Sequence, residues 1–216
     1  MMSRKLRLTC VAAALAMSAL DPSLVSAETE VGQLRAKGDG ASAYFYEVDP
    51  TGCIYMETYL DVLEGRVSTE PGPPEASTRI SFVSYDYDAC ADRYLSVLYG
   101  FTDIPAHDFR TRGLLSASLQ TTIIAENRRP DGFFSVPLTF DLLWTGEGEM
   151  GRNGMRVERN RVPGFTYMTR FSGTSRDAAL DGTITFGSRN LADSDSIYAV
   201  LMENQSAVTT ILFDPR

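Results

Sequence analysis

The sequence has few of the side chains on which most catalytic and metal sites depend. Its 216 residues include one histidine, His107, three cysteines and two lysines. One histidine and so few thiols cannot complete a zinc site without carboxylates. A serine–histidine–aspartate triad needs a well-placed serine, and no Gly-x-Ser-x-Gly elbow is present to supply it. We therefore assign no catalytic residue, and we expect no resident cofactor other than calcium, which is considered below.

Long apolar runs are also absent, since no segment reaches the roughly 20 apolar residues that cross a bilayer. The first 27 residues instead have the three parts of a secretory signal peptide. They begin with positive charge, continue with the apolar run Leu8–Leu20 and end with the small-residue pattern Val25-Ser26-Ala27. We expect cleavage after Ala27 and export of residues 28–216 to the periplasm or the outside of the cell, with no transmembrane segment.

Positive charge is scarce as well. The chain has a net charge of −8, and loss of the signal peptide removes three cations and Asp21, which makes the charge of the exported part −10. Nucleic-acid binding depends on neutralising phosphates, so this balance argues against a nucleic-acid partner. Solubility outside the cell is the simplest explanation of the acidity.

Two cysteines remain after the expected cleavage, because Cys10 leaves with the signal peptide. Exported proteins fold in an oxidising compartment, where an even pair of cysteines is best explained by a disulfide. The sequence thus predicts a single bond between Cys53 and Cys90.

What the sequence does have is strand-like alternation of apolar and polar residues, which is clearest in residues 134–144. Every second residue there is apolar, and this periodicity places those residues on one buried face. Pro137 cannot donate a ladder hydrogen bond, so we expect this strand to lie at a sheet edge or to carry a bulge. The predicted core residues are Phe134, Val136, Leu138, Phe140, Leu142 and Trp144.

Residues 115–125 alternate in the same way, and turn formers fill residues 127–132, so the two segments predict a long hairpin. Further strands are expected at 154–162, 165–172, 178–187, 197–203 and 207–213, with turns at Pro163-Gly164, near Asp181-Gly182 and across 188–196. For residues 89–99 we prefer a strand over a short helix. Many short strands with regular turns predict an all-β, antiparallel β-sandwich, with a β-barrel as the alternative.

The N-terminal part shows the pattern of a degenerate repeat. Residues 41–65 and 78–100 align through their cysteines, and each copy has the order strand, turn with aspartate, cysteine, strand. Equivalent cysteines in neighbouring hairpins would suit a bridge between them. The proline-rich stretch within 66–77 is the predicted linker, but neither side is long enough for a core of its own, so residues 28–216 are expected to form one domain.

Short motifs in the second half support a resemblance. Leu142-Leu143-Trp144-Thr145-Gly146-Glu147-Gly148 and Arg161-Val162-Pro163-Gly164-Phe165, together with the two cysteine hairpins, resemble a group of uncharacterised secreted bacterial proteins. The likeness covers most of the exported chain. It implies export and β structure, and it implies no activity and no catalytic residues.

Two charged groups are candidate ligand sites. Asp86, Asp88 and Asp92 are closely spaced oxygen donors of the kind that calcium prefers, although the glycine and the final glutamate of an EF-hand loop are missing. The alternative is a polar turn. The arginines of residues 152–176 include Arg156, Arg159, Arg161 and Arg170, and they predict a surface for sulfated or phosphorylated glycans. Their alternative is ion pairing within the protein.

Two classes of function follow. The first is an exported, non-catalytic β protein that binds a glycan, a peptide or an anionic ligand, or a protein partner, outside the cell. The tyrosines and phenylalanines at 44–46, 55–59, 82–87 and 94–101 are numerous enough for a binding platform, although half of any strand faces the core. The second class is a hydrolase that uses only carboxylates and acts on a polysaccharide. We favour the first.

Overall fold

The computed structural model describes residues 31–69, 73, 75–162, 165–194 and 196–213, so the predicted signal peptide lies outside the described residues. The described residues form strands and turns and contain no helix. Nothing in them therefore meets the length and hydropathy that a membrane-crossing helix requires. The strands are β1 (Val31–Val48), β2 (Ile54–Thr69), β3 (Glu75–Asp88), β4 (Arg93–Ile104), β5 (Phe109–Thr111), β6 (Ser116–Arg129), β7 (Gly132–Val162), β8 (Phe165–Phe186), β9 (Arg189–Asn190) and β10 (Ser196–Phe213).

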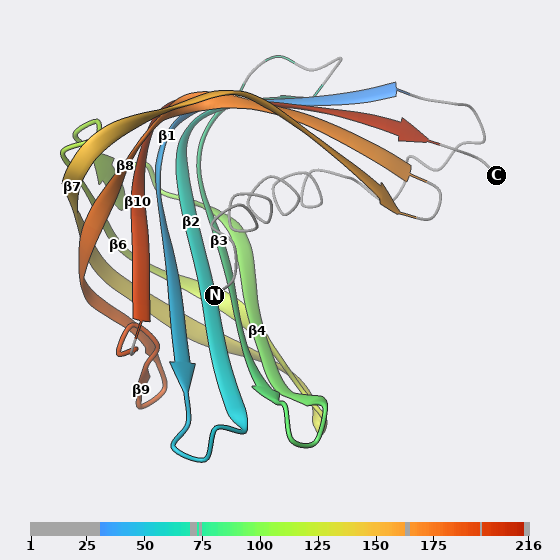
Figure 1. Ribbon diagram of the computed structural model, residues 1–216, viewed down its shortest axis with the longest axis vertical. Coiled ribbons are helices and arrows are strands. Elements are labelled where there is room, and N and C mark those ends of the chain that lie inside the picture. The colour runs from blue at the N-terminus through green and yellow to red at the C-terminus, as the bar shows by residue number, and fades with distance from the viewer. Residues whose placement is uncertain (1–30, 70–72, 74, 163–164, 195, 214–216) are drawn as a thin grey trace.

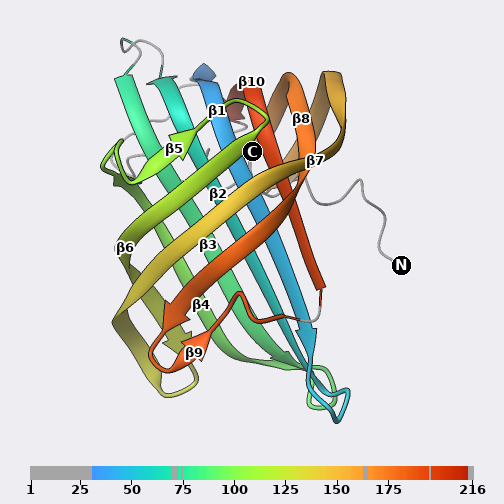
Figure 2. The ribbon, with the colours of Figure 1, turned by 90° about the vertical axis from the view of Figure 1, so that its left-hand side faces the viewer.

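Hydrogen bonding joins eight of these strands into a closed circuit. The order along the sheet is β10-β1-β2-β3-β4-β6-β7-β8, and β8 pairs again with β10. All strand pairings are antiparallel, and the junction between β4 and β6 is the shortest, with three residue pairs. Figures 1 and 2 show the strands wrapped around a common interior. The prediction of an all-β antiparallel fold is confirmed, and we describe the architecture as a closed antiparallel sheet.

Four strands continue beyond the closed part and form what we call the extension, which leaves the rest of the sheet at a steep angle near the top of Figure 1. Its parts are residues 31–38 of β1, 205–213 of β10, 165–173 of β8 and 153–162 of β7. Each pairing in it is irregular at this level, with register shifts between Gly38 and Gly40, Glu203 and Ser206, Gly146 and Met150, and Asn153 and Arg156. Because β-bulges bend a strand, these aligned shifts let the strands turn together.

Glycine is required where β1 and β2 enter this bend. Gly38 and Gly65 are directly paired. A Cβ atom on Gly38 would lie 2.1 Å from the backbone oxygen of Glu64, and one on Gly65 would lie 2.2 Å from the backbone oxygen of Lys37. No side chain fits at such distances, so the close approach of the two strands depends on both glycines.

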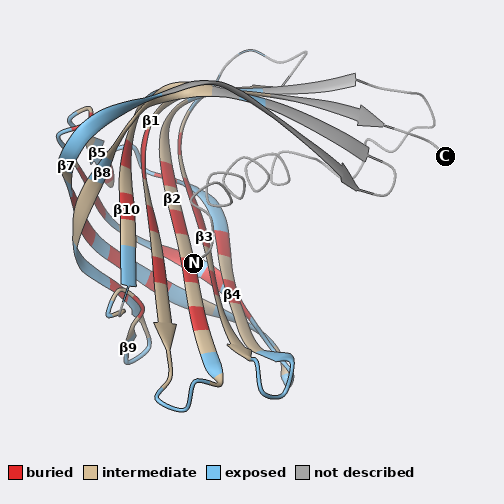
Figure 3. Cartoon of the chain, viewed as in Figure 1, coloured by how far each residue is buried: buried red, intermediate tan, exposed pale blue. Residues whose placement is uncertain are grey.

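The core fills the inside of the closed sheet with side chains from alternate positions of each strand. Phe45, Leu60, Phe82 and Leu119 are fully buried, and the ring of Phe82 packs edge-on against that of Phe140. Figure 3 shows the buried positions spaced along the strands of the closed part. Period-two alternation therefore determines which face of each strand packs inside.

The predicted hairpin is confirmed, with β6 and β7 paired from Ser116 to Arg129. Of the six predicted core residues, Leu138, Phe140, Leu142 and Trp144 are buried, and Val136 is partly buried against the core. Phe134 is 46% exposed, so its assignment to the core is wrong. The alternation continues to this residue, but pairing of β7 with β8 begins only at Thr139, so β8 does not extend beside Phe134.

Pro137 lies at an edge, as predicted. It is opposite Ile124 of β6, but pairing of β7 with β8 begins only at Thr139. The missing N–H group of proline therefore leaves no ladder bond unmade on the second side.

Several predicted boundaries are wrong because the strands are longer than expected. β7 continues to Val162, and β8 runs without a turn through Asp181-Gly182. Gly182 has φ +120° and lies against the backbone of β7, so it marks a close approach within a strand instead of a turn. The predicted turn at Pro163-Gly164 lies outside the described residues. The predicted linker 66–77 is mostly strand, since β2 ends at Thr69 and β3 begins at Glu75.

The disulfide between Cys53 and Cys90 is present and joins the turns of two neighbouring hairpins. Cys53 lies between β1 and β2, and Cys90 lies between β3 and β4, which matches the arrangement expected from the repeat. Residues 93–104 form a strand, as preferred over a helix. The bond therefore ties together the free ends of two hairpins that also share the β2–β3 pairing.

Candidate functional site

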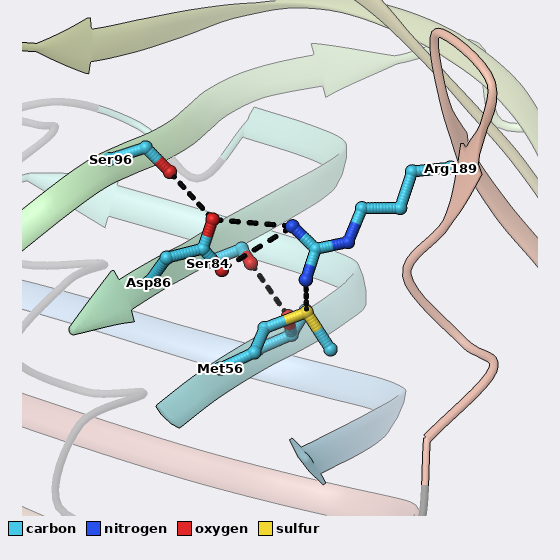
Figure 4. Close-up of polar contacts among 6 residues, drawn as sticks. Met56, Ser84, Asp86, Ser96 and Arg189 are labelled. Carbon is cyan, nitrogen blue, oxygen red and sulfur yellow. Dashed lines mark hydrogen bonds and ion pairs between the residues drawn. The ribbon is translucent and has the colours of Figure 1, made fainter. Parts of the chain in front are cut away.

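Polar side chains gather at one end of the interior, where the loop that contains β9 reaches across to β2 and β3 (Figure 4). Arg189 places Nη1 3.2 Å from Oδ2 of Asp86 and Nη2 2.8 Å from the sulfur of Met56. The hydroxyl of Ser96 donates to the same Asp86 oxygen at 3.0 Å. These contacts attach the β9 loop to the opposite wall of the sheet, and they engage Asp86 from two sides.

Deeper inside lie three buried polar groups. The hydroxyls of Thr58 and Ser84 are 2.7 Å apart and hydrogen-bond to each other. Asn127 is 2% exposed, and its Oδ1 atom has no hydrogen-bond partner among the described residues. Leu191 of the β9 loop is buried in the core. At this end of the interior, Leu191 packs in the core and Arg189 binds Asp86 and Met56. These contacts hold the β9 loop against β2 and β3.

The three predicted calcium ligands do not converge. Asp86 faces the interior and binds Arg189, whereas Asp88 accepts hydrogen bonds from the backbone N–H groups of residues 90–91. Asp92, with φ +50°, accepts the hydroxyl proton of Tyr87. Within the described part of the chain no group of three or more histidine, cysteine, aspartate or glutamate side chains is placed to hold a metal ion. The geometry is that of the polar turn named as the alternative.

His107 lies in a turn and contacts its neighbour in the sequence. Its Nε2 atom is 3.2 Å from Oδ1 of Asp108, although adjacent residues of an extended strand would point apart. Asp108 also accepts a hydrogen bond from Thr121, and the histidine side chain is 78% exposed. The pair is therefore a surface contact within a turn.

The four predicted anion-binding arginines lie in the extension, but not on one face. Residues that are directly opposite in an antiparallel pair point to the same side of the sheet. Val157 is opposite Arg170, so the positions of Arg159 and Arg161 share the side of Arg170, and that of Arg156 is on the other side. Arg170 is exposed, whereas the side chains of the other three lie outside the description.

The register adds three cations that the sequence did not point to. Val208 of β10 is opposite both Arg35 and Arg170, and Lys37 is opposite Arg66 of β2. All four charged side chains are exposed and share one side of the extension and of the end of β2 that is paired with it, and we call this side the cationic face. The described neutral residues between them on this side are Ser68, Ser172, Ser206 and Val208. The sequence gives little indication of this face, because Arg35, Lys37 and Arg66 do not belong to an arginine-rich stretch.

Tyrosines form a second grouping, on the outer side of β1–β4. The ring centroids of Tyr44 and Tyr59 are 4.9 Å apart, those of Tyr59 and Tyr85 are 6.4 Å apart and those of Tyr85 and Tyr94 are 5.7 Å apart. We call this set, with its neighbours, the tyrosine face. Its flanking members are Tyr46, Tyr55 and Tyr87. The predicted aromatic stretches thus divide between the core, which takes the phenylalanines Phe45 and Phe82, and this face.

Glu57 is the acceptor at the centre of the tyrosine face. The hydroxyl of Tyr59 donates to its Oε2 atom at 2.5 Å, and the ring of Tyr85 packs against that of Tyr59. Burial and the neighbouring carboxylate raise the pKa of Tyr59 and of Tyr85. Both hydroxyls are therefore protonated donors at neutral pH, and their rings are held in fixed orientations.

Asp61 lies on the same outer side of β2, between Ser42 of β1 and Ser81 of β3. Its Oδ1 atom is buried without a hydrogen-bond partner in the described residues. Burial raises the pKa of Asp61 to about 7, and the hydrogen bond with Ser42 opposes this shift. The group could hold or release a proton near neutral pH. The hydrolase alternative stays a prediction without a residue assignment.

Comparisons with known proteins give no family. No family model matches the chain, and no curated protein is similar to it in sequence. Two solved structures are similar to it. One is an acetoacetate decarboxylase-like enzyme from Sphingomonas wittichii RW1, with 10% identity, a TM-score of 0.35 and coverage of 90% of this chain and 96% of that one. The other is a protein assigned as AttH from Nitrosomonas europaea, with 14% identity, a TM-score of 0.25 and coverage of 90% and 56%. Likenesses this distant carry no argument about activity.

Proposed function

We propose that this protein is exported and binds a polyanionic ligand, of which an acidic glycan is the class that fits best, through the cationic face. The observation that supports the proposal is the grouping of Arg35, Lys37, Arg66 and Arg170. They come from three strands, they are exposed, and they share one side of the sheet formed by the extension and the paired end of β2. The expected signal peptide and the disulfide, which is compatible with an oxidising compartment, agree with a function outside the cytoplasm.

The charge of the rest of the molecule makes this face selective. The whole chain carries −8, so most of the surface repels a polyanion, whereas the cationic face attracts it, although Asp39 and Glu64 are paired on the same side beside Lys37 and Arg66. Such a distribution orients the ligand before contact. Three of the four cations are arginines, which bind sulfate, phosphate and carboxylate groups through two parallel hydrogen bonds.

The shape of the site indicates a repeating ligand. The four cations lie on the surface of a sheet, in rows set by the strand spacing of about 4.8 Å. Each charge alone binds weakly in water. A chain of sulfated or carboxylated sugars can contact all four at once, and the contacts then add up to a measurable affinity.

A heparin column tests the proposal, with heparin as the sulfated probe. We expect the exported form to be retained at low salt and released by moderate salt, because screening weakens exposed charges. The variant with Arg35, Lys37, Arg66 and Arg170 all changed to Gln should pass through unretained.

The matched control changes four exposed arginines of the closed part to Gln, namely Arg93, Arg110, Arg128 and Arg129. It loses the same charge and should still be retained. Flow-through of the unaltered protein at low salt, or equal loss of retention in both variants, would show that the cationic face is not a binding site.

A further inference from the structure

We propose that the tyrosine face is a second binding site, and that its ligand is a neutral polysaccharide whose sugar rings stack on the tyrosines. The site is separate from the cationic face. It lies on the outer side of β1–β4, where the tyrosines alternate with the buried residues Phe45, Leu60 and Phe82. The proposal does not depend on binding of a polyanion.

The rings form one continuous surface across four strands. Tyr44 contacts Tyr59, Tyr59 contacts Tyr85, and Tyr85 contacts Tyr94, with centroid distances between 4.9 and 6.4 Å. Tyr87 extends the surface from Tyr94, at 5.2 Å. Steps of this size are comparable with the spacing of neighbouring strands. An extended ligand that crosses the strands therefore meets a ring at every step.

The rings are fixed in place before any ligand arrives. Glu57 accepts a hydrogen bond from Tyr59, Asp92 accepts one from Tyr87, and the ring of Tyr85 packs between those of Tyr59 and Tyr94. The disulfide between Cys53 and Cys90 holds the adjoining turns together. A binding surface that is already ordered loses little conformational entropy when it binds, which favours affinity.

The chemistry of the face fits a sugar better than an apolar partner. Tyrosine offers an apolar ring with a polar hydroxyl at its edge. A sugar offers a matching apolar C–H surface with hydroxyls around it, and these can donate to Glu57. A fully apolar partner would instead bury the Glu57 carboxylate away from water, which is costly. The carboxylate of Glu57 at the centre of the face would also repel an anionic sugar.

Accessibility increases toward the end of the face. Tyr94 is 58% exposed, whereas Tyr44, Tyr59 and Tyr85 keep an intermediate exposure. Tyr94 also contacts both Tyr85 and Tyr87, so its exposed ring continues the surface formed by these two tyrosines. We therefore assign Tyr94 as the principal stacking residue.

Affinity electrophoresis tests this site with three soluble neutral probes, hydroxyethylcellulose, laminarin and galactomannan. Binding to the same polysaccharides is also measured in about 1 M salt. This salt reduces the Debye length to about 3 Å and so removes binding by the cationic face. We expect at least one probe to retard the unaltered protein. The substitution Tyr94→Ala should weaken that binding about tenfold, and Tyr94→Phe, which keeps the ring, should preserve it.

Two controls make the result specific. Phe133→Ala removes an aromatic ring that is 63% exposed but lies on the β6–β7 hairpin, and it should leave binding unchanged. The quadruple cationic-face variant should also bind the neutral probes as the unaltered protein does. The proposal is overturned if none of the three probes retards the unaltered protein, or if Tyr94→Ala binds as well as Tyr94→Phe while both melt at the same temperature.

Discussion

At the scale of single residues, Asp61 is the side chain whose protonation should affect stability most. Its folded-state pKa is about 7, well above the usual value for aspartate. Between about pH 4 and pH 7 the folded chain therefore holds a proton that the unfolded chain has lost, so stability falls as the pH rises through this range and is level above it. The Asp61→Asn variant should lack this fall.

Urea unfolding at several pH values measures the effect. We expect the free energy of unfolding of the unaltered protein to fall relative to Asp61→Asn by about 3–4 kcal/mol between pH 4 and pH 8, because the pKa of Asp61 rises on folding from 3.8 to about 7. Asp193→Asn, at an exposed carboxyl in the β9 loop, is the control and should follow the unaltered protein. Parallel pH profiles for the unaltered protein and Asp61→Asn would show that the Asp61 carboxyl is not held in its neutral form.

Phe140 and Phe134 give a second comparison, because both lie in β7 on the same side but differ in burial. Phe140 is 1% exposed and contacts Phe82, whereas Phe134 is 46% exposed. Phe140→Ala should lower the free energy of unfolding by about 3–5 kcal/mol, through lost burial and a cavity. Phe134→Ala should lower it by less than about 1 kcal/mol. Equal effects in urea titrations would contradict the position assigned to the core.

Alternation in the sequence predicts the direction of a side chain, but not how far the packed interior extends. Leu138, Phe140, Leu142 and Trp144 are buried as predicted, and Phe134 fails although it obeys the same period. Phe134 lies before Thr139, the point where pairing of β7 with β8 begins. That point is determined by the lengths of the other strands, which a local pattern does not contain.

At the scale of the elements, the disulfide joins the turns of two hairpins. Cys53 and Cys90 are 37 residues apart in the sequence, so the bond restricts the unfolded chain by about 4 kcal/mol in the chain-entropy treatment. The oxidised protein should melt well above a reduced and alkylated sample. A double variant, Cys53→Ser with Cys90→Ser, should melt near the reduced sample, and identical melting of all three would refute a stabilising role.

Strand existence was easier to predict than strand length. The β6–β7 hairpin has strong alternation and clear turn formers, and its two strands pair as predicted. β7 and β8 continue through glycines that resemble turn signals in the sequence. Gly182 is one of these, and its positive φ serves a close contact with β7 inside a strand. Glycine permits a positive φ both in a turn and within a strand. Which of the two forms depends on the neighbouring strand, and the local sequence does not contain that information.

At the scale of the whole molecule, the closed sheet brings together charges that are far apart in the chain. Arg35 and Lys37 from β1 meet Arg170 from β8 through β10, and Arg66 joins them from β2. The sequence showed an arginine-rich stretch and included Arg170 in it, but it could not supply the partners. They depend on the pairing of the N-terminal and C-terminal strands, which no local pattern encodes.

The same argument explains the division of the aromatic residues. The sequence predicts that some aromatic side chains face the core and others do not, and the register shows that Phe45 and Phe82 point inward while Tyr59 and Tyr85 point outward. A binding platform becomes visible only when four strands are placed side by side. The disulfide and the closed circuit of pairings hold that platform in place.

The most direct test of the proposed function is chemical-shift mapping of the exported protein with a sulfated heparin oligosaccharide. The account predicts that the largest shifts occur at residues 35–37, 66 and 168–172, and that they vanish when salt screens the charges. Shifts that instead centre on Arg128 and Arg129 of the β6–β7 hairpin, or that are spread evenly over all exposed arginines, would contradict the assignment of the cationic face as the ligand site.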